Sequence, residues 1–178
     1  MHRSMDGTEI RRSLARMAHE IVEDLSGEEG LLLVGIHSGG VPLAHRLAQH
    51  IGAIEGRLPE VGEMDITLYR DDLYTGLEHP VLGDTRLPET ITGVRVVLVD
   101  DVLFTGRTVR AALDELMDFG RPACIKLAVL VDRGHRELPV SGDYVGRTIE
   151  TQKVDRITVQ AGVEPAETDC VLLERQGA

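Results

Sequence analysis

Two adjacent carboxylates, Asp100 and Asp101, directly follow an apolar run at 96–99. A run of this length with β-branched residues is typical of a fully buried strand in a parallel sheet. A Thr-Gly turn comes next, and then a segment at 107–119 whose apolar residues recur at helical spacing. Strand, acidic pair, turn and helix start are therefore expected to meet at the carboxyl edge of the sheet, which is where open α/β sheets bind ligands.

The turn after the acidic pair has the composition of an anion-binding loop. Gly106 can adopt backbone angles closed to other residues, so successive N–H groups can point inward. The start of the next helix adds unpaired N–H groups and partial positive charge, while Thr105, Arg107 and Thr108 add side-chain donors. Carboxylates repel a bare phosphate, so we expect a ligand that also presents hydroxyls or a magnesium ion, as a phosphorylated ribose does. These residues alone leave one alternative open, a strand-ending turn in which an aspartate caps the helix.

Two further stretches place polar residues at the same edge. The apolar run 31–36 leads into the loop His37-Ser38-Gly39-Gly40 and then into a predicted helix with Pro42 near its first turn. This second loop could hold a second anion. A third apolar run, 123–131, ends in Asp132, Arg133 and Gly134, for which a simple turn is an equally good interpretation.

The remaining patterns predict a single α/β domain over residues 1–178. Asp6 and Glu9 have the spacing of a capping box, which would begin a helix that runs to about residue 25. Residues 63–68 alternate as a strand does. Short strands are expected nearer the C-terminus, at 156–159 and 171–173. This order predicts a central parallel sheet flanked by helices, with a long irregular segment at 69–93 that is typical of a functional lid or a disordered loop.

Composition narrows the classes of function. A net charge of −11 argues against a broadly basic nucleic-acid surface, although a local basic patch stays possible because screening limits each charge to its neighbourhood. Cys124 and Cys170 lie in apolar stretches, which favours buried free thiols over a disulfide. We expect no structural zinc site, because no CxxC and no paired histidine spacing occurs. Without a membrane-spanning run or a leader pattern, a cytoplasmic protein is the expectation.

Longer motifs carry a resemblance to a known family. The stretch VVLVDDVLFTGRT (96–108) resembles the phosphoribosyl-pyrophosphate signature of type I phosphoribosyltransferases. Together with IRRSLARMAHEI (10–21), DITLYRDDL (65–73) and LAVLVDRGHRELP (127–139), it resembles the PyrR family. Members of that family regulate the pyrimidine operon and also act as uracil phosphoribosyltransferases. The resemblance implies a type I phosphoribosyltransferase fold with a small hood built from terminal segments.

The resemblance also implies the substrates and their sites. The chain would make uridine monophosphate (UMP) from uracil and phosphoribosyl pyrophosphate (PRPP), with Mg²⁺ held mainly by PRPP. Asp100 and Asp101 would bind the ribose hydroxyls, and Tyr69 and Arg70 would close over the pyrophosphate. The 5′-phosphate would lie against the loop Val102, Leu103, Phe104, Thr105, Gly106, Arg107 and Thr108. The pyrophosphate would face His37, Ser38, Gly39 and Gly40. The uracil would face Asp132, Arg133 and Gly134.

One departure from the family affects the pyrophosphate loop. Gly39 stands where family members commonly have an arginine, in a loop that reads Thr-Arg-Gly rather than Ser-Gly-Gly. Loss of a charge-assisted contact to phosphate costs roughly 1.5–3 kcal/mol. We therefore expect weaker pyrophosphate binding unless Arg70 or His37 compensates.

By the same resemblance, a basic face of a homodimer or higher oligomer would bind a hairpin of pyrimidine-operon leader mRNA when UMP or UTP occupies the active site. The matching positions are Arg16, His19, Arg136 and Arg147. Ala15 and Ser141 replace a polar and a basic residue, so a transferase with weakened or lost RNA binding is the alternative. A remote alternative, a receiver-like domain with Asp100 or Asp101 as phosphoacceptor, would normally have its acidic pair after the first strand instead.

Overall fold

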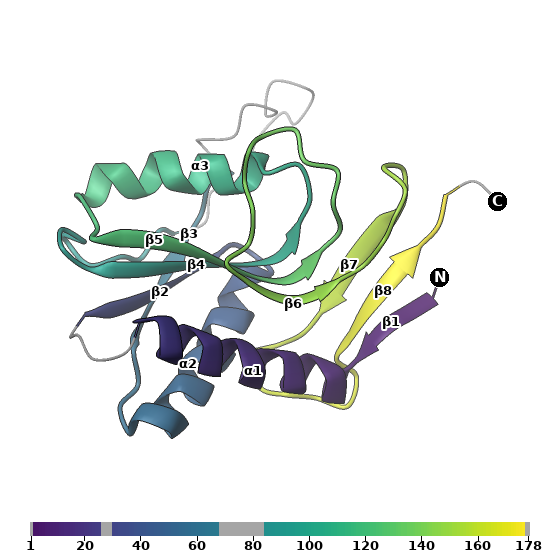
Figure 1. The fold of residues 1–178 in the computed structure, drawn as a ribbon, viewed down its shortest axis with the longest axis horizontal. Coiled ribbons are helices and arrows are strands. Elements are labelled where there is room, and N and C mark those ends of the chain that lie inside the picture. Colours follow the sequence, from purple (N-terminus) through teal and green to yellow (C-terminus); the bar gives the residue numbers. More distant parts are fainter. Residues whose placement is uncertain (1, 26–29, 68–83, 177–178) are drawn as a thin grey trace.

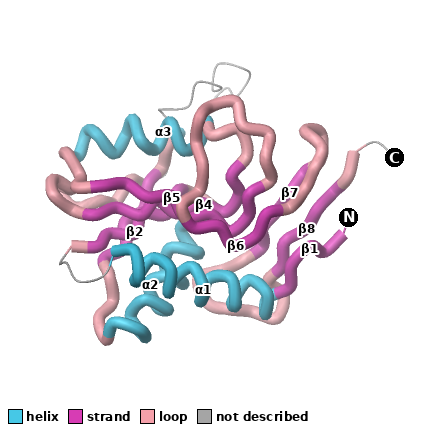
Figure 2. Tube along the Cα trace, viewed as in Figure 1, coloured by secondary structure: helices cyan, strands magenta, loops and turns pink. Residues whose placement is uncertain are grey.

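The computed structural model describes residues 2–25, 30–67 and 84–176. Within these ranges the chain forms two sheets (Figures 1 and 2). The larger is a five-stranded parallel sheet in the order β3-β2-β4-β5-β6, and the smaller is a three-stranded antiparallel sheet in the order β1-β8-β7. Figure 1 shows the small sheet beside one end of the large one.

The strands of the large sheet are β2 (Leu31–Ile36), β3 (Glu60–Met64), β4 (Arg95–Leu103), β5 (Cys124–Asp132) and β6 (Tyr144–Thr148). Because all five run in one direction, the loops after them open on one edge of the sheet. α2 (Gly40–Glu55) follows β2 on one face, and α3 (Arg107–Leu116) follows β4 on the other (Figure 1). The chain thus reverses its winding between β2 and β4, and ligands of doubly wound sheets bind at such a switch point.

Two hydrophobic cores hold these layers together. Val97 and Val99 of β4 pack with α2 and with α1 (Gly7–Leu25), while Val96 and Leu98 pack with α3 on the opposite face. This alternation is the reason that the strand is apolar without interruption. The predicted capping box begins α1, since the Asp6 N–H donates to Glu9 (2.9 Å) and the Glu9 N–H donates to Asp6 (2.8 Å).

The small sheet is tied to the main layers by polar contacts. Its strands are β1 (His2–Asp6), β7 (Arg156–Gln160) and β8 (Cys170–Glu174). Arg46 of α2 forms a buried ion pair with Asp169, just before β8, at 2.8 Å. Arg147 of β6 donates to the carbonyl of Ser4 and to Glu9, both at 2.9 Å.

Four predicted strands are confirmed within a residue or two, at 31–36, 123–131, 156–159 and 171–173. The predicted helix at 107–119 is also confirmed, and it ends in a 3-10 turn (η2, Met117–Phe119). The strand predicted at 63–68 is wrong in its bounds. Parallel pairing with β2 places it at 60–64, and Asp65 then accepts the Thr67 N–H in a turn. β4 also extends through the acidic pair to Leu103, because it stays paired with β5. β1 and β6 were not predicted.

No helix in the described ranges has both the length and the apolar composition needed to cross a membrane.

Candidate active site

The acidic pair lies near the end of β4, where strand geometry separates the two carboxylates. Consecutive residues of a strand point to opposite faces of the sheet. Asp100, with 6 % of its surface exposed, lines a cavity beside the start of α3. Asp101 instead lies against Gly39, where an added Cβ would be 2.3 Å from Asp101 Oδ2. The pair therefore presents one carboxylate to each of the two neighbouring loops.

The cavity next to Asp100 has a volume of about 320 Å³. The whole loop predicted to bind phosphate belongs to its lining, which comprises Asp100, Val102, Leu103, Phe104, Thr105, Gly106, Arg107, Thr108 and Val109. Gly106 has φ +92°, a left-handed conformation that favours glycine. The N–H groups of Thr105, Gly106 and Thr108 have no acceptor within the described ranges. The cavity thus offers N–H donors at a helix N-terminus, which is the arrangement that binds phosphate.

The outer side of this loop is covered by the segment 133–140, which follows β5. The Arg133 N–H donates to the Leu103 carbonyl at 3.1 Å. The N–H groups of Glu137 and Leu138 both donate to the Thr105 carbonyl, at 2.9 and 3.2 Å. The carbonyls of Leu103 and Thr105 therefore find their donors in this segment.

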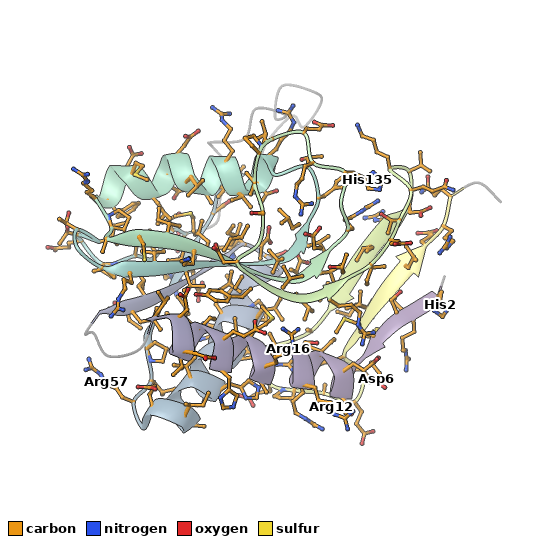
Figure 3. All side chains as sticks on the ribbon, viewed as in Figure 1. His2, Asp6, Arg12, Arg16, Arg57 and His135 are labelled. Carbon is orange, nitrogen blue, oxygen red and sulfur yellow. The ribbon has the colours of Figure 1, made fainter. Side chains whose placement is uncertain are left out.

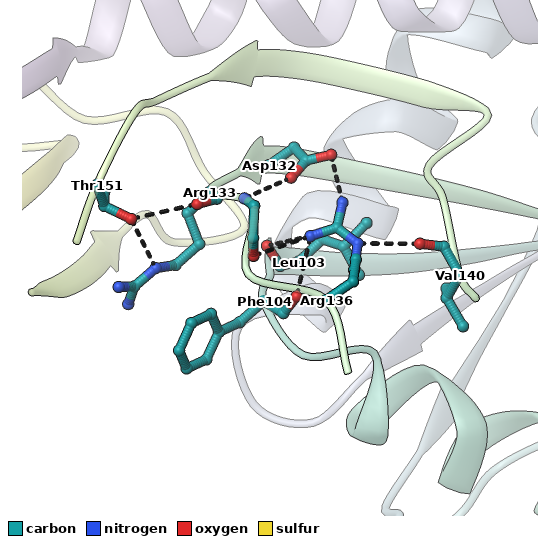
Figure 4. Close-up of polar contacts among 8 residues, drawn as sticks. Leu103, Phe104, Asp132, Arg133, Arg136, Val140 and Thr151 are labelled. Carbon is teal, nitrogen blue, oxygen red and sulfur yellow. Dashed lines mark hydrogen bonds and ion pairs between the residues drawn. The ribbon is translucent and has the colours of Figure 1, made fainter. Parts of the chain in front are cut away.

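The Arg136 side chain connects the loop 102–108 to the segment 133–140 through several hydrogen bonds (Figure 4). Its guanidinium donates to the carbonyls of Phe104 (2.9 Å), Gly134 (3.1 Å) and Val140 (2.9 Å), and it pairs with the carboxylate of Asp132. A planar guanidinium with five donors can make these contacts together, which a lysine ammonium could not. Arg136 therefore acts as a clamp on the loop 102–108 (the phosphate loop), which it holds through the backbone carbonyl of Phe104.

The second predicted anion-binding loop, 37–40, lies against β4, with Gly39 next to Asp101. Gly40 begins α2 so close to β4 that a Cβ there would lie 2.1 Å from the Val99 carbonyl oxygen. The peptide bond between His37 and Ser38 is cis. Glycine at 39 and 40 allows this close approach, so the N-terminus of α2 lies directly beside Asp101.

The residues expected on the uracil side have internal partners. Asp132 accepts the Gly134 N–H (2.9 Å) as well as the Arg136 guanidinium. Arg133, 6 % exposed, donates to Thr151 (3.3 Å) and to the Gln152 carbonyl (2.8 Å). Their polar groups are therefore satisfied within the protein, and none of the three residues belongs to the lining of the cavity beside Asp100.

An aromatic contact links Arg133 to the loop 102–108. The guanidinium of Arg133 lies 4.1 Å from the centre of the Phe104 ring, and the His135 ring meets Phe104 edge-on at 5.9 Å. His135, labelled in Figure 3, also contacts the Thr151 carbonyl at 2.7 Å. His135 was not among the residues predicted from the sequence. Its position directly after the Asp-Arg-Gly run was the one signal that could have pointed to it.

Burial sets the electrostatics of the acidic pair. It raises the pKa of the Asp101 carboxyl, and hydrogen bonds from Asp100 and the neighbouring backbone only partly oppose this shift. A ligand that brings positive charge or hydroxyl donors to Asp101 would therefore stabilise its ionised form.

The four residues predicted to bind RNA lie in different surroundings. Arg16 and His19 are exposed on α1 (Arg16 is labelled in Figure 3), although Arg16 also donates to the carbonyls of Val145 and Gly146. Arg147 lies at the same boundary of α1 and β6, paired with Glu9. Arg136 belongs to the clamp behind the phosphate loop instead.

Tyr69 and Arg70, predicted to close over the pyrophosphate, lie outside the described residues, as does the first part of the expected lid. Its last part, 84–93, is packed against the sheet: Arg86 exchanges backbone hydrogen bonds with Glu63, and Ile91 is fully buried. Among the residues that the structure covers, no three metal-ligating side chains gather as a metal site.

Comparisons with known proteins agree with this geometry. Residues 6–166 match the model of the phosphoribosyl transferase domain. The chain is 54% identical over 174 residues to a "Bifunctional protein PyrR" of Thermus thermophilus, covering 98% of this chain and 96% of that protein. A protein of the same name from Herpetosiphon aurantiacus is 56% identical over 172 residues, covering 97% and 96%. The crystal structure of a hypoxanthine phosphoribosyltransferase of Trypanosoma cruzi superposes with a TM-score of 0.75 at 21% identity, covering 99% and 98% of the two chains. This last likeness concerns the fold alone.

Proposed function

The chain belongs to the phosphoribosyltransferase family, within its PyrR group, and we propose that it transfers the phosphoribosyl group of PRPP to uracil and regulates pyrimidine genes by binding leader mRNA. One observation carries the transferase assignment beyond the family match. Asp100 and the N–H groups of Thr105, Gly106 and Thr108 line one cavity at the switch point of the sheet. Family membership and this geometry leave no support for the receiver-like alternative.

In this assignment the 5′-phosphate of PRPP accepts hydrogen bonds from the N–H groups of Thr105, Gly106 and Thr108, and the ribose hydroxyls donate to Asp100. Buried carboxylates make strong acceptors for hydroxyl donors. Asp101, on the other side of β4, faces the pyrophosphate loop at 37–40. The two loops thus hold the two phosphorylated ends of one sugar, which fixes the anomeric carbon between them.

Transfer breaks the bond between the anomeric carbon and the pyrophosphate oxygen. A uracil ring nitrogen forms the new bond and gives up its proton, which the departing pyrophosphate or solvent takes. Positive charge develops on the ribose in an oxocarbenium-like transition state, which the carboxylates at 100 and 101 stabilise. Mg²⁺ held mainly by PRPP would neutralise charge on the leaving pyrophosphate when bound. Within the described ranges no three metal-ligating side chains gather, which fits an ion held mainly by its substrate.

On the base side, we assign the uracil to the wall formed by 132–134, beneath a hood formed by the small sheet of β1, β7 and β8. The contact between Arg133 and Phe104 holds this wall in a fixed position relative to the phosphate loop. Tyr69 and Arg70 are proposed to close over the pyrophosphate, as the family resemblance implies. The chain works in the cytoplasm in this proposal, as a single domain.

The test is UMP formation from labelled uracil by the purified protein with PRPP and Mg²⁺. We expect activity that falls at least about a hundredfold in Asp100→Asn, because a carboxylate aligned with developing charge contributes on this scale. The matched control is Asp114→Asn on the exposed face of α3, which should retain full activity. A wild-type protein that makes no UMP under these conditions would refute the assignment.

The regulatory role rests on the bifunctional PyrR relatives and on the basic residues at the α1–β6 boundary. We propose that Arg16, His19 and Arg147 contribute to an RNA-binding face of a homodimer, with UMP in the active site favouring the bound form. A gel shift with the leader hairpin, with and without UMP, tests this. Removing a cation that neutralises an RNA phosphate, as in Arg16→Ala, should weaken binding and flatten its salt dependence. Absence of a shift even at low salt would leave the transferase as the sole function.

A further inference from the structure

The turn directly before β7 is closed around a buried carboxylate. The Gln152 N–H donates to Asp155 Oδ2 at 2.7 Å, and the Asp155 N–H donates back to the Gln152 carbonyl at 3.1 Å. The other oxygen, Asp155 Oδ1, accepts the N–H of Gln176, just after β8, at 3.2 Å. Asp155 is 5% exposed, whereas the three residues before it are exposed. Its carboxylate therefore fastens the turn 152–155 (the hood turn) to the end of β8.

The hood turn holds the side chain of Arg133, the residue after β5. The Gln152 carbonyl accepts a hydrogen bond from Arg133 Nη2 at 2.8 Å. The Thr151 hydroxyl lies 3.3 Å from Arg133 Nε and 3.2 Å from the Arg133 carbonyl oxygen (Figure 4). Burial lowers the pKa of the Arg133 guanidinium, and the negative charge of Asp155 opposes this shift. Asp155 thus supports Arg133 both through the turn and through its charge.

Arg133 carries the contact onward to the phosphate loop. Its guanidinium lies 4.1 Å from the centre of the Phe104 ring, and Phe104 lines the cavity beside Asp100. A cation is attracted to the face of an aromatic ring only at short range, so the ring and the guanidinium fix each other's position. The contacts form a continuous path from Asp155, through the hood turn and Arg133, to the lining of the cavity.

We propose that Asp155 is a positioning residue for phosphoribosyl transfer, because the turn that it closes sets where the Arg133 guanidinium and the Phe104 ring lie. This inference rests on the proposed transferase function and deepens it, since it gives the small sheet a part in shaping the PRPP cavity. Asp155 contacts neither substrate in this role and acts through Arg133.

A second turn of the same construction supplies a matched control. The Ala166 N–H donates to Asp169 Oδ2 at 3.2 Å, and the Asp169 N–H donates back to the Ala166 carbonyl at 3.1 Å. Asp169 is 4% exposed, but it pairs with Arg46 on α2. Asp155→Asn and Asp169→Asn therefore each remove one buried carboxylate from a capped turn beside the small sheet, and only the first lies on the path to the cavity.

The first test observes the Phe104 ring and requires no turnover. The chain has two phenylalanines, Phe104 and Phe119, so labelling with para-fluorophenylalanine gives one fluorine NMR signal from each. Asp155→Asn should shift the Phe104 signal, because asparagine keeps the shape of aspartate but loses its charge and replaces one acceptor oxygen with a donor group. The Phe119 signal should stay in place, and Asp169→Asn should leave both signals where the wild type has them.

A second variant reaches the same ring without opening the turn. Thr151→Val removes only the hydroxyl beside Arg133, and it should move the Phe104 signal by a smaller amount than Asp155→Asn. It tests the path even if Asp155→Asn does not fold. A Phe104 signal that keeps its wild-type position in the folded variants overturns the inference.

The second test separates positioning from a loss of stability. In Asp155→Asn, kcat/KM for PRPP should fall roughly tenfold to a hundredfold, the scale on which displacement of a substrate-positioning group acts. Asp169→Asn should lower the melting temperature but keep kcat/KM close to the wild-type value. In an Arg133→Leu background, Asp155→Asn should cause little further loss, because residues that act along one path are not additive.

The outcomes distinguish this inference from the function on which it rests. A wild type that forms UMP, together with an Asp155→Asn variant of unchanged kcat/KM and Phe104 signal, overturns the role of Asp155 and leaves the transferase intact. Equal losses in Asp155→Asn and Asp169→Asn, or additive losses with Arg133→Leu, also show that the inference is wrong. A wild type that forms no UMP overturns the transferase instead, even where the Phe104 signal shifts in Asp155→Asn.

Discussion

Replacing Arg136 with alanine should impair the transferase site, although sequence resemblance assigns this residue to RNA. In the structure, its guanidinium holds the carbonyls of Phe104 and Val140 and the carboxylate of Asp132. Its side chain is 22% exposed, so most of these contacts are shielded from water. The substitution would leave the carbonyls and the carboxylate without their main donor.

The expected cost follows from the contacts. Hydrogen bonds to a charged group contribute roughly 1.5–3 kcal/mol each, and removal of one partner of a buried ion pair costs about 3–5 kcal/mol. Because contacts that share one side chain are not additive and water can partly replace them here, we expect a loss of about 3 kcal/mol in the free energy of unfolding. At roughly 2–4 °C per kcal/mol for a chain of this size, the melting temperature should fall by about 6–12 °C.

The assay combines thermal unfolding, followed by circular dichroism, with PRPP kinetics. The KM for PRPP should rise in Arg136→Ala, because the phosphate loop loses its support from behind. Arg110→Ala is the matched control, since Arg110 pairs with Asp114 at 3.3 Å on an exposed helix face. It should change the free energy of unfolding by less than about 1 kcal/mol.

The result that would refute this reasoning is specific. If Arg136→Ala melts like the wild type and keeps its KM for PRPP, but no longer shifts the leader hairpin, then Arg136 faces RNA and the clamp is unimportant. If stability and KM both change as expected, loss of RNA binding in this variant cannot be assigned to a direct contact.

Three other substitutions test the geometry of the two loops. Gly40→Ala places a Cβ 2.1 Å from the Val99 carbonyl oxygen, so β4 and α2 must separate. Unfolding by denaturant should show that the free energy of unfolding falls by about 3 kcal/mol, and unchanged stability would contradict the close approach. Gly106→Ala forces alanine to φ +92°, which costs about 1–3 kcal/mol. Calorimetry should then show weaker PRPP binding. Normal binding would mean that the loop amides do not hold the 5′-phosphate. Asp101→Asn tests the raised pKa of Asp101. In the folded protein this carboxyl keeps its proton to a higher pH than the ordinary aspartate pKa of 3.8 would allow. The wild type therefore loses stability as the pH rises from about 3.8 through the folded pKa, and the variant does not. Its melting temperature should therefore gain on the wild type with rising pH while transferase activity falls, and parallel melting curves across pH would contradict the shift.

Local patterns were sufficient to predict the main layers of the fold. Buried parallel strands such as β2 and β5 are continuous apolar runs, and α1 begins with a capping box that needs only its own residues. β6 and β1 carry no such pattern, because their strand conformation depends on partners far away in the chain. The bounds of β3 were misplaced for the same reason, since pairing with β2 decides where that strand ends.

The sequence by itself determined that an acidic pair, a Thr-Gly turn and a second glycine loop come together, because parallel strands bring their carboxyl ends to one edge. Only the tertiary structure decided what each polar side chain does there. It separated Asp100 from Asp101 by strand alternation, placed Arg136 behind the phosphate loop, and set Arg133 against Phe104. A side chain's role depends on its partners in space, and these partners lie on other elements of the chain, so no local spacing of residues can reveal them.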